Sequence, residues 1–215
     1  MRITVTGIGY VGLVTAVYLA DLGHEVTCID LNKSKIDSLQ TGHSPIHEPD
    51  FGPLLVKNIS YSRLFFTTNP KTAYREADII FITVGTPAKK DGTMNLRYIT
   101  AITDTIAQQI TNDIIICTKS TVPVGTNEKI KQMIDSQKAG PFITTVISNP
   151  EFLREGSAIF VFFHGDRIVI GSDNSEASET MEKLYAPLHI PIIIFLSAGH
   201  SIYLKQLMPL PNHFI

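Results

Sequence analysis

The sequence predicts an α/β protein with a doubly wound, mostly parallel sheet, helices on both faces and a short α/β extension at its C-terminal end. Three features support this class. A β-branched run at residues 2–6 leads into a glycine-rich turn and an apolar helix. Runs at residues 78–84 and 114–118 are almost continuously apolar, as in parallel strands covered on both faces. Small or polar residues follow the carboxyl ends of most predicted strands.

The first strand runs directly into a G-x-G-x-x-G at residues 7–12. A helix follows at residues 13–22, and Gly23 stops it where a left-handed cap is expected. A second strand at residues 25–29 ends at Asp30. This order of strand, glycine turn, helix, strand and acid is the dinucleotide-binding pattern of a Rossmann-type sheet.

Each glycine of the turn has a separate physical task. Gly7 permits the tight turn out of the strand, Gly9 lets the backbone approach a pyrophosphate, and Gly12 lets the helix pack closely on the sheet. The helix start also offers free N–H groups and the positive end of its dipole, which favour a diphosphate. A glycine turn in some other βαβ unit is the alternative interpretation, but it leaves Asp30 unexplained.

Asp30 predicts which dinucleotide binds. It lies about twenty residues beyond the glycines, where an acid accepts hydrogen bonds from the adenosine ribose hydroxyls. A carboxylate there repels a 2′-phosphate, so the sequence predicts NAD rather than NADP. Lys35 follows closely enough to reach the adenosine side of the cofactor, although a solvated helix lysine would explain it equally well.

The rest of the chain supplies the other elements of the sheet. Further strands are predicted at residues 64–68, 78–84, 114–118, 142–148 and 192–195. Helices are predicted at residues 32–39 with Asn32 as N-cap, 53–58, 70–75, 95–110, and from about residue 126 to 137. Residues 41–53 are rich in proline and glycine and predict a loop. Pro45 separates His43 from His47, so no metal site is expected there.

Composition excludes several classes of function. The 215 residues are 44 % hydrophobic and carry a formal charge of -2, which gives no sign of a nucleic-acid or membrane partner. No run is long and apolar enough to span a membrane, and a strand that begins at Arg2 is not a signal peptide. Cys28 and Cys117 fall inside predicted buried strands, as reduced thiols of a cytoplasmic protein would.

The polar clusters follow three later strands at Gly85-Thr86-Pro87, residues 119–125 and residues 149–156. Carboxyl ends of parallel strands meet at one edge, where open α/β sheets bind ligands, so we expect a single site there. Loops are polar in any case, but this does not explain why each cluster follows the carboxyl end of a strand.

Four ordered motifs resemble nucleotide-sugar dehydrogenases of the UDP-glucose 6-dehydrogenase group. They are GIGYVGL at residues 7–13, VGTP at 84–87, KSTVPVG at 119–125 and NPEFLREGSA at 149–158. The resemblance extends from residue 1 to about residue 195. GDP-mannose 6-dehydrogenases share most of these motifs, but the Gly-Ser-Ala at residues 156–158 looks more like the UDP-glucose branch.

The resemblance implies an NAD-dependent oxidation of UDP-glucose to UDP-glucuronate, in two successive steps at C6 of the sugar. In the family a cysteine captures the intermediate aldehyde as a thiohemiacetal, which is oxidised to a thioester and hydrolysed. Full-length members are homo-oligomers. No metal is implied.

The resemblance also assigns residues. The pyrophosphate group is held by Gly7, Gly9, Tyr10, Val11 and Gly12. Asp30 and Lys35 take the adenosine side, and Thr86, Thr121 and Glu155 approach the nicotinamide half. Thr121 and Glu151 lie near the reacting carbon, where Glu151 handles the proton of the attacking water. The sugar nucleotide lies against Glu151, Phe152, Leu153, Arg154 and Glu155. Without its motif, Glu151 would read equally well as a solvated loop acid.

The C-terminal part departs from the family. Members continue into a central helix with a substrate-contacting Lys and Asn, a loop with the catalytic cysteine and a uridine-binding domain, none of which is recognisable after Ser197. Within residues 160–167, Val161 and Gly165 replace the usual Asp and Pro. Neither Cys28 nor Cys117 is placed to act as the nucleophile.

We therefore divide the chain into an NAD-binding domain at residues 1–196 and an atypical tail at residues 197–215. A shifted reading frame near codon 196 is the favoured origin of the tail, and a vector-derived end is the next. We expect the tail to be poorly ordered or held by a neighbouring molecule.

Three functional interpretations stay open. The chain is the NAD-binding part of a UDP-glucose 6-dehydrogenase that is inactive alone, a free-standing NAD-binding module, or a folded fragment without function. The motifs after the later strands favour the first origin, because a protein that only binds NAD has no need of Thr121 and Glu151.

Overall fold

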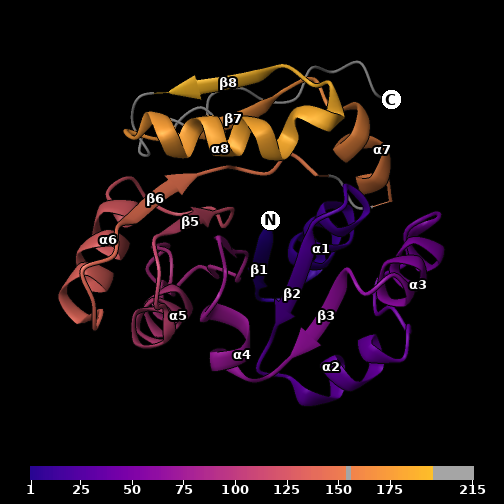
Figure 1. The fold of residues 1–215 in the computed structure, drawn as a ribbon, viewed down its shortest axis with the longest axis horizontal. Coiled ribbons are helices and arrows are strands. Elements are labelled where there is room, and N and C mark those ends of the chain that lie inside the picture. The colour runs from indigo at the N-terminus through magenta and orange to yellow at the C-terminus, as the bar shows by residue number, and fades with distance from the viewer. Residues whose placement is uncertain (154–155, 196–215) are drawn as a thin grey trace.

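The computed structural model describes residues 1–153 and 156–195, and it contains one eight-stranded sheet (Figure 1). Its strands are β1 Arg2–Thr6, β2 Glu25–Ile29, β3 Leu64–Thr67, β4 Ile79–Ile82, β5 Ile114–Thr118, β6 Thr144–Ser148, β7 Ile168–Gly171 and β8 Ile192–Phe195. Their order across the sheet is β3-β2-β1-β4-β5-β6-β7-β8. β6 and β7 are antiparallel, whereas the other neighbouring pairs are parallel. The predicted doubly wound, mostly parallel sheet is confirmed.

Helices cover both faces of this sheet and enclose two apolar cores. They are α1 Tyr10–Asp21, α2 Lys33–Gln40, α3 Phe51–Ser60, α4 Pro70–Tyr74, α5 Arg97–Gln109, α6 Thr126–Gln137, α7 Ala158–His164 and α8 Ser175–Tyr185, with a short 3-10 turn at Ala186–Leu188. Buried residues of α1, α2, α3, α7 and α8 form one core, and those of α4, α5 and α6 form the other. The strands between them are therefore apolar on both sides, as the sequence predicted.

Three predicted helix starts are wrong, and one of them is that of α5, which begins at Arg97 rather than at residue 95. Helix α1 begins at Tyr10 rather than residue 13, because Gly9 is already its extended N-cap. Helix α3 begins at Phe51, so residues 51–53 of the predicted loop are helical. Pro53 is tolerated there because it lies in the first helical turn, where an N–H has no intrahelical acceptor to lose.

The predicted α/β extension consists of α7, β7, α8 and β8. Asn174 caps α8, its side chain accepting a 2.8 Å hydrogen bond from the backbone N–H of Ala177. β8 is the last strand of the described sheet, and its Ile193 is 40 % exposed. The expectation about the tail at residues 197–215 lies outside the described residues.

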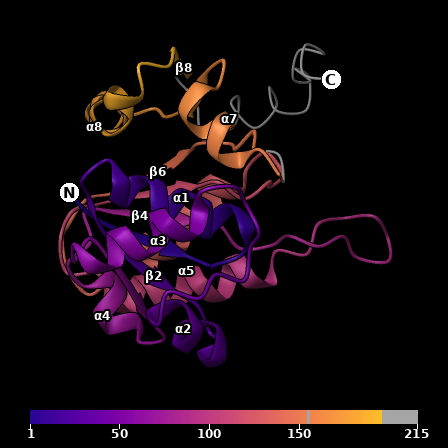
Figure 2. The same cartoon turned by 90° about the vertical axis from the view of Figure 1, so that its right-hand side faces the viewer.

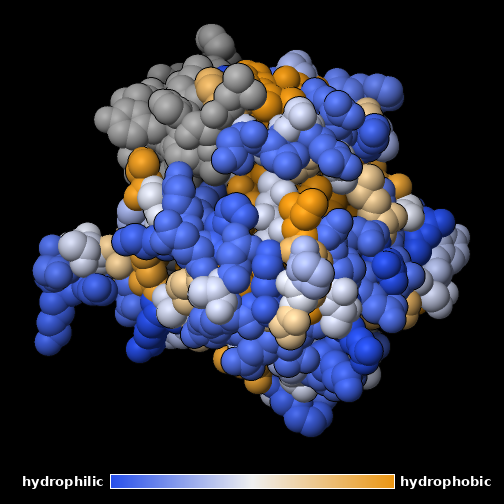
Figure 3. Space-filling model, turned by 60° about the vertical axis from the view of Figure 1, so that its left-hand side comes forward, coloured by the Kyte–Doolittle hydropathy of each residue, from blue (hydrophilic) through white to orange (hydrophobic). Residues whose placement is uncertain are grey.

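The segment between β4 and α5 projects from the body as a narrow hairpin (Figure 2). An antiparallel bridge between Ala88 and Met94 closes its stem, and the N–H of Lys89 donates a 2.7 Å hydrogen bond to the carbonyl oxygen of Thr93. On the face shown in Figure 3, hydrophilic residues predominate and the visible hydrophobic residues form several small groups.

The glycine turn gives a direct test of this packing. A Cβ on Gly12 would lie 2.1 Å from the carbonyl oxygen of Gly7 and 2.5 Å from Oγ1 of Thr83, whereas a Cβ on Gly9 would meet nothing within 4 Å. We expect Gly12→Ala to lower the free energy of unfolding by about 3 kcal/mol or more, because α1 must move off the sheet. The matched variant Gly9→Ala should change it by less than about 0.5 kcal/mol. Denaturant unfolding measures both variants, and equal losses would contradict the packing described.

Candidate functional site

The turn between β1 and α1 is held from both neighbouring strands. Gly7 has φ +90, a left-handed conformation that suits glycine, and its N–H donates to the carbonyl oxygen of Ile29 at the end of β2. From the β4 side, Oγ1 of Thr83 donates to the carbonyl oxygens of Thr6 and Gly7, at 2.9 and 2.7 Å. The position of the turn is therefore set by a backbone bond from β2 and by the Thr83 hydroxyl on the β4 side.

The start of α1 has the properties of an anion site. Gly9 is its N-cap, and no side chain caps the helix. The first turn carries no acidic residue, and the space beside the Gly9 α-carbon is open to 4 Å. A diphosphate can therefore approach the backbone at the positive end of the helix, so this turn fits the pyrophosphate of a dinucleotide.

Asp30 lies beside this turn and joins it to α2. Its Oδ2 accepts hydrogen bonds from the N–H of Ile8 and from Nζ of Lys35, each at 3.0 Å, and its Oδ1 accepts from the N–H of Asn32 at 2.9 Å. Burial acts to raise the pKa of Asp30, but these three hydrogen bonds and the charge of Lys35 outweigh it and lower the pKa below its ordinary value. An ionised carboxylate is thus held where the ribose hydroxyls of an NAD would need an acceptor.

Lys35 is positioned by the same group. Its ammonium also donates to the carbonyl oxygen of Ile8 at 3.1 Å, and its side chain is 28 % exposed. The side chain is therefore tied to the glycine turn and is not a solvated lysine of a helix surface.

The loops after β4 and β5 are bonded to each other. Oγ1 of Thr86 donates to the carbonyl oxygen of Thr121 at 2.8 Å, and Oγ of Ser120 donates to the carbonyl oxygen of Val84 at 2.7 Å. Two residues expected at the nicotinamide half, Thr86 and Thr121, are thus brought together by segments that are far apart in the sequence.

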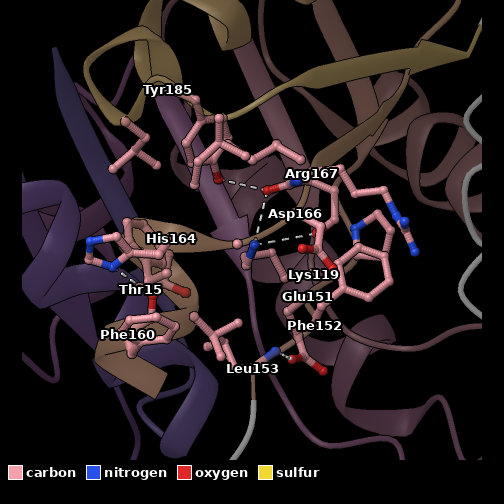
Figure 4. A pocket seen from close by; sticks show the side chains of 18 of the residues that line it. Thr15, Lys119, Glu151, Phe152, Leu153, Phe160, His164, Asp166, Arg167 and Tyr185 are labelled. Atoms are coloured by element: carbon pink, nitrogen blue, oxygen red, sulfur yellow. Dashed lines mark hydrogen bonds between the residues drawn. The ribbon is translucent and has the colours of Figure 1, made fainter. Parts of the chain in front are cut away.

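A buried polar cluster anchors the loop that follows β6 (Figure 4). Oδ1 of Asn149 accepts from Nζ of Lys119 at 3.0 Å and from the hydroxyl of Tyr185 at 2.7 Å, while its Nδ2 donates to the carbonyl oxygen of Val169 at 2.9 Å. Lys119 is only 6 % exposed. Burial raises the pKa of Tyr185 well above its ordinary value, so its hydroxyl stays protonated and donates. These bonds fix where the segment containing Glu151 begins.

A cavity of about 410 Å³ opens next to this cluster, within the size range of small-molecule sites. Glu151, Phe152 and Leu153 line it together with Lys119, and Oε2 of Glu151 accepts a 2.7 Å hydrogen bond from the N–H of Leu153 (Figure 4). The structure therefore gathers these three residues of the expected sugar-nucleotide set at one cavity. Arg154 and Glu155, the other two, lie outside the described residues.

The cavity and the cofactor turn are separate parts of the sheet edge. Gly7, Gly9, Thr86 and Thr121 are not among the described residues that line the cavity. The predicted residues thus form three local groups, at the glycine turn, at the Thr86–Thr121 contact and at the cavity.

The two thiols are inert in the structure. Cys28 and Cys117 are fully buried in β2 and β5, and burial raises the pKa of both, that of Cys117 to about 12. The described part of the chain holds no group of three or more His, Cys, Asp or Glu residues arranged to bind a metal. None of its helices is long and apolar enough to cross a membrane.

The sequence interpretation missed several residues that organise the site. Thr83 follows the apolar residues of β4, and a polar residue at that point was the one sign in the sequence that its side chain has a specific partner. Lys119 and Asn149 lie in recognised motifs, but no role was assigned to either. Tyr185 and Glu48 carried no signal, because their partners are distant in the sequence: Tyr185 bonds to Asn149, and Glu48 bonds to Tyr10 and to the segment before α7.

Comparison with known proteins agrees with this geometry. Residues 1–189 match the model of the UDP-glucose/GDP-mannose dehydrogenase family, NAD binding domain. The chain is 52 % identical over 192 residues to the UDP-glucose 6-dehydrogenase YwqF of Bacillus subtilis, an alignment that covers 89 % of this chain and 44 % of that protein. It is 45 % identical over 193 residues to a UDP-glucose 6-dehydrogenase of Rhizobium meliloti, covering 88 % of this chain and 44 % of the relative.

Solved structures show the same relationship. A UDP-glucose dehydrogenase from Pyrobaculum islandicum superposes with a TM-score of 0.90 at 36 % identity, covering 95 % of this chain and 48 % of that one. A GDP-mannose dehydrogenase from Pseudomonas aeruginosa gives a TM-score of 0.91 at 34 % identity, covering 96 % and 49 %. The chain thus spans less than half the length of these relatives. With an NAD-binding turn, an acid at the end of β2 and a family match over residues 1–189, the chain belongs to the UDP-glucose/GDP-mannose dehydrogenase family, whose cofactor is NAD.

Proposed function

We propose that this chain is the NAD-binding part of an enzyme that oxidises UDP-glucose to UDP-glucuronate in two steps at C6 of the sugar. The observation that carries the proposal is the cavity at the end of β6, where Glu151 lies beside the buried Lys119–Asn149 pair. A module that only bound NAD would have no need of an acid at a second cavity. The sequence similarity to enzymes named UDP-glucose 6-dehydrogenase, at 52 % and 45 % identity, supports this sugar nucleotide over GDP-mannose.

The residues divide the work as follows. The N–H groups at the start of α1 bind the pyrophosphate, and Gly9 gives it room. Asp30 accepts from the adenosine ribose, with Lys35 beside it. Thr86 and Thr121, with Glu155, take the nicotinamide half. NAD, when bound, accepts the hydride from C6 of the sugar.

The substrate side rests on the loop after β6. Glu151 acts as the base for the attacking water, with Thr121 near the reacting carbon. Phe152, Leu153 and Arg154, with Glu155, line the sugar-nucleotide site. Phe152 is held for this purpose by Arg167, whose guanidinium carbon lies 5.8 Å from the centre of the Phe152 ring.

The chain by itself binds NAD but does not complete the oxidation. Its two cysteines are buried in strands, and the relatives carry more than half of their length outside the part that this chain matches. The family resemblance puts the catalytic cysteine and the uridine-binding residues in that other part. A working active site, and the oligomer in which family members assemble, therefore need residues beyond those that the alignment covers.

Cofactor choice tests the role of Asp30. The unaltered chain should bind NAD more tightly than NADP, because the ionised carboxylate repels a 2′-phosphate. Asp30→Ala should narrow the difference by about tenfold or more, through weaker NAD binding and tighter NADP binding. Isothermal titration calorimetry measures both affinities, with Asp37→Ala, at an exposed aspartate of the neighbouring helix α2, as a control. Equal affinity of the unaltered chain for the two cofactors would rule out this role.

The contact between Asp30 and NAD has a defined pH dependence. The pKa of Asp30 lies below its ordinary value, so the carboxylate stays ionised from about pH 8 down to about pH 5. We expect the affinity for NAD to stay constant over that range and to fall only in stronger acid. The comparison uses NAD alone, because the 2′-phosphate of NADP itself changes charge at about pH 6. An NAD affinity that already falls between pH 7 and pH 6 would show that another group controls it.

Turnover tests the division between cofactor binding and chemistry. Incubated with NAD and UDP-glucose, the chain should form no more NADH than a Gly9→Val variant, whose side chain fills the space beside the pyrophosphate. NADH absorbance measures the product, and a parallel titration confirms that the unaltered chain binds NAD. Sustained NADH formation above the variant would show that these residues alone carry out the oxidation.

A further inference from the structure

Glu48 connects two parts of the site that are distant in the sequence. Its side chain comes from the segment between α2 and α3 and is only 8 % exposed. The carboxylate accepts hydrogen bonds from the hydroxyl of Tyr10, from the N–H of Gly156 and from the N–H of Ala158, the last at 3.2 Å. Tyr10 is the first residue of α1, and Gly156 and Ala158 end the loop that carries Glu151.

The segment that presents Glu48 is itself well held. Oγ of Ser44 both donates to the carbonyl oxygen of Ile46 and accepts from its N–H, which makes a closed local turn. Beyond Glu48, the N–H of Phe51 donates to the Glu48 carbonyl oxygen at 3.3 Å, and the Phe51 ring is fully buried. The carboxylate is therefore a fixed point and not the end of a mobile loop.

The loop after β6 is thus anchored at both ends. Asn149 and its partners Lys119 and Tyr185 hold the beginning, and Glu48 holds the end at Gly156. Glu151 lies between these anchors. A shift of the Glu48 carboxylate would therefore displace both the loop and the first turn of α1.

Packing of α7 on α1 supports the same coupling. The ring of Tyr18 in α1 lies 4.7 Å from that of Phe162 and 5.0 Å from that of Phe163, measured between ring centres. Helix α7 begins at Ala158, whose N–H donates to Glu48, and Gly156 lies two positions before it. Glu48 and these ring contacts therefore join the two helices at two places.

We infer that Glu48 is a positioning residue that fixes the cofactor turn and the β6 loop relative to each other, so that NAD at the turn orders the loop that carries Glu151. The inference rests on the proposed binding of NAD at this turn. All three partners of the carboxylate are donors, so an amide in its place would set its own N–H₂ against one of them. A group that served only the stability of the fold would hold the loop equally well with and without cofactor.

The test compares Glu48→Gln and Tyr10→Phe, alone and combined, with Asp50→Asn as the matched control. Asp50 is exposed, lies two positions away and undergoes the same loss of charge, and asparagine tolerates its left-handed backbone at φ 60. Calorimetry gives the NAD affinity of each chain. Hydrogen–deuterium exchange of the peptide covering residues 147–153, with and without saturating NAD, reports the order of the segment that contains Glu151.

We expect NAD to slow exchange in this peptide in the unaltered chain and in Asp50→Asn, but not in Glu48→Gln. Glu48→Gln should weaken NAD binding by about tenfold, the value of a hydrogen bond to a charged group. Adding Tyr10→Phe to Glu48→Gln should cost less than Tyr10→Phe costs in the unaltered chain, because the neutral amide accepts from the Tyr10 hydroxyl more weakly than the carboxylate does. Tyr10→Phe alone leaves the segment of Glu48 intact, so it carries the test if Glu48→Gln does not fold.

Two results would overturn the inference. One is that NAD still slows exchange of the peptide in both Glu48→Gln and Tyr10→Phe. The other is that the losses of NAD affinity caused by the two substitutions simply add in the combined variant. An unaltered chain that binds no NAD would instead contradict the proposed function, and the titration shows this directly. In that case the double-mutant cycle of Glu48→Gln and Tyr10→Phe is measured on the free energy of unfolding without cofactor. Coupling between Tyr10 and Glu48 there supports the positioning contact, and additivity overturns it.

Discussion

The close contact between α1 and the turn that precedes it is the constraint on which the structure depends. Gly12 lies so near the carbonyl oxygen of Gly7 that no side chain fits between them. Thr83 closes the turn from β4 through two backbone acceptors. Because α1 cannot move along the sheet, the N–H groups of its first turn keep a fixed position relative to the glycine turn. The cofactor turn is thus preorganised by packing, before any ligand contributes energy.

Beyond that turn, hydrogen bonds connect the loops along the carboxyl edge of the sheet. Each contact joins neighbouring strands: the Gly7 turn to β2 and β4, Thr86 to Thr121, and Lys119 to Asn149. Most of the acceptors are backbone carbonyls or one buried amide. Such bonds are short-range and directional, so the loops after β4, β5 and β6 hold their shapes without covering one another.

The interface of α1 with α7 has a different character. It is made largely of rings, and the hydroxyls of Thr15 and Tyr18 are buried there without a hydrogen-bond partner in the described structure. An unpaired buried hydroxyl costs about 1 to 3 kcal/mol, so this contact is less stable than its apolar area suggests. Glu48 supplies polar bonds at the end of the same interface. These bonds explain how the interface of α1 with α7 keeps one arrangement although two of its buried hydroxyls have no hydrogen-bond partner in the described structure.

The sequence by itself determined the parallel sheet, the glycine turn and the acid after β2. These depend on local patterns: apolar runs of strand length, glycines at the spacing that a tight turn requires, and an acid at a strand end. Local patterns also predicted correctly that the loop after β6 lies at the carboxyl edge of the sheet, because the direction of each strand follows from the alternation of strands and helices. The family resemblance added the identity of the cavity residues to this frame.

Tertiary structure alone decided how those loops are held. Glu48 and Tyr185 act through partners between 36 and 110 positions away, and nothing in their immediate neighbours distinguishes them from ordinary loop or helix residues. Lys119 lies in a motif, but its partner Asn149 is 30 positions away. Local sequence specifies backbone conformation through sterics and short-range hydrogen bonds, whereas the partner of a buried polar group is set only when the whole chain has packed.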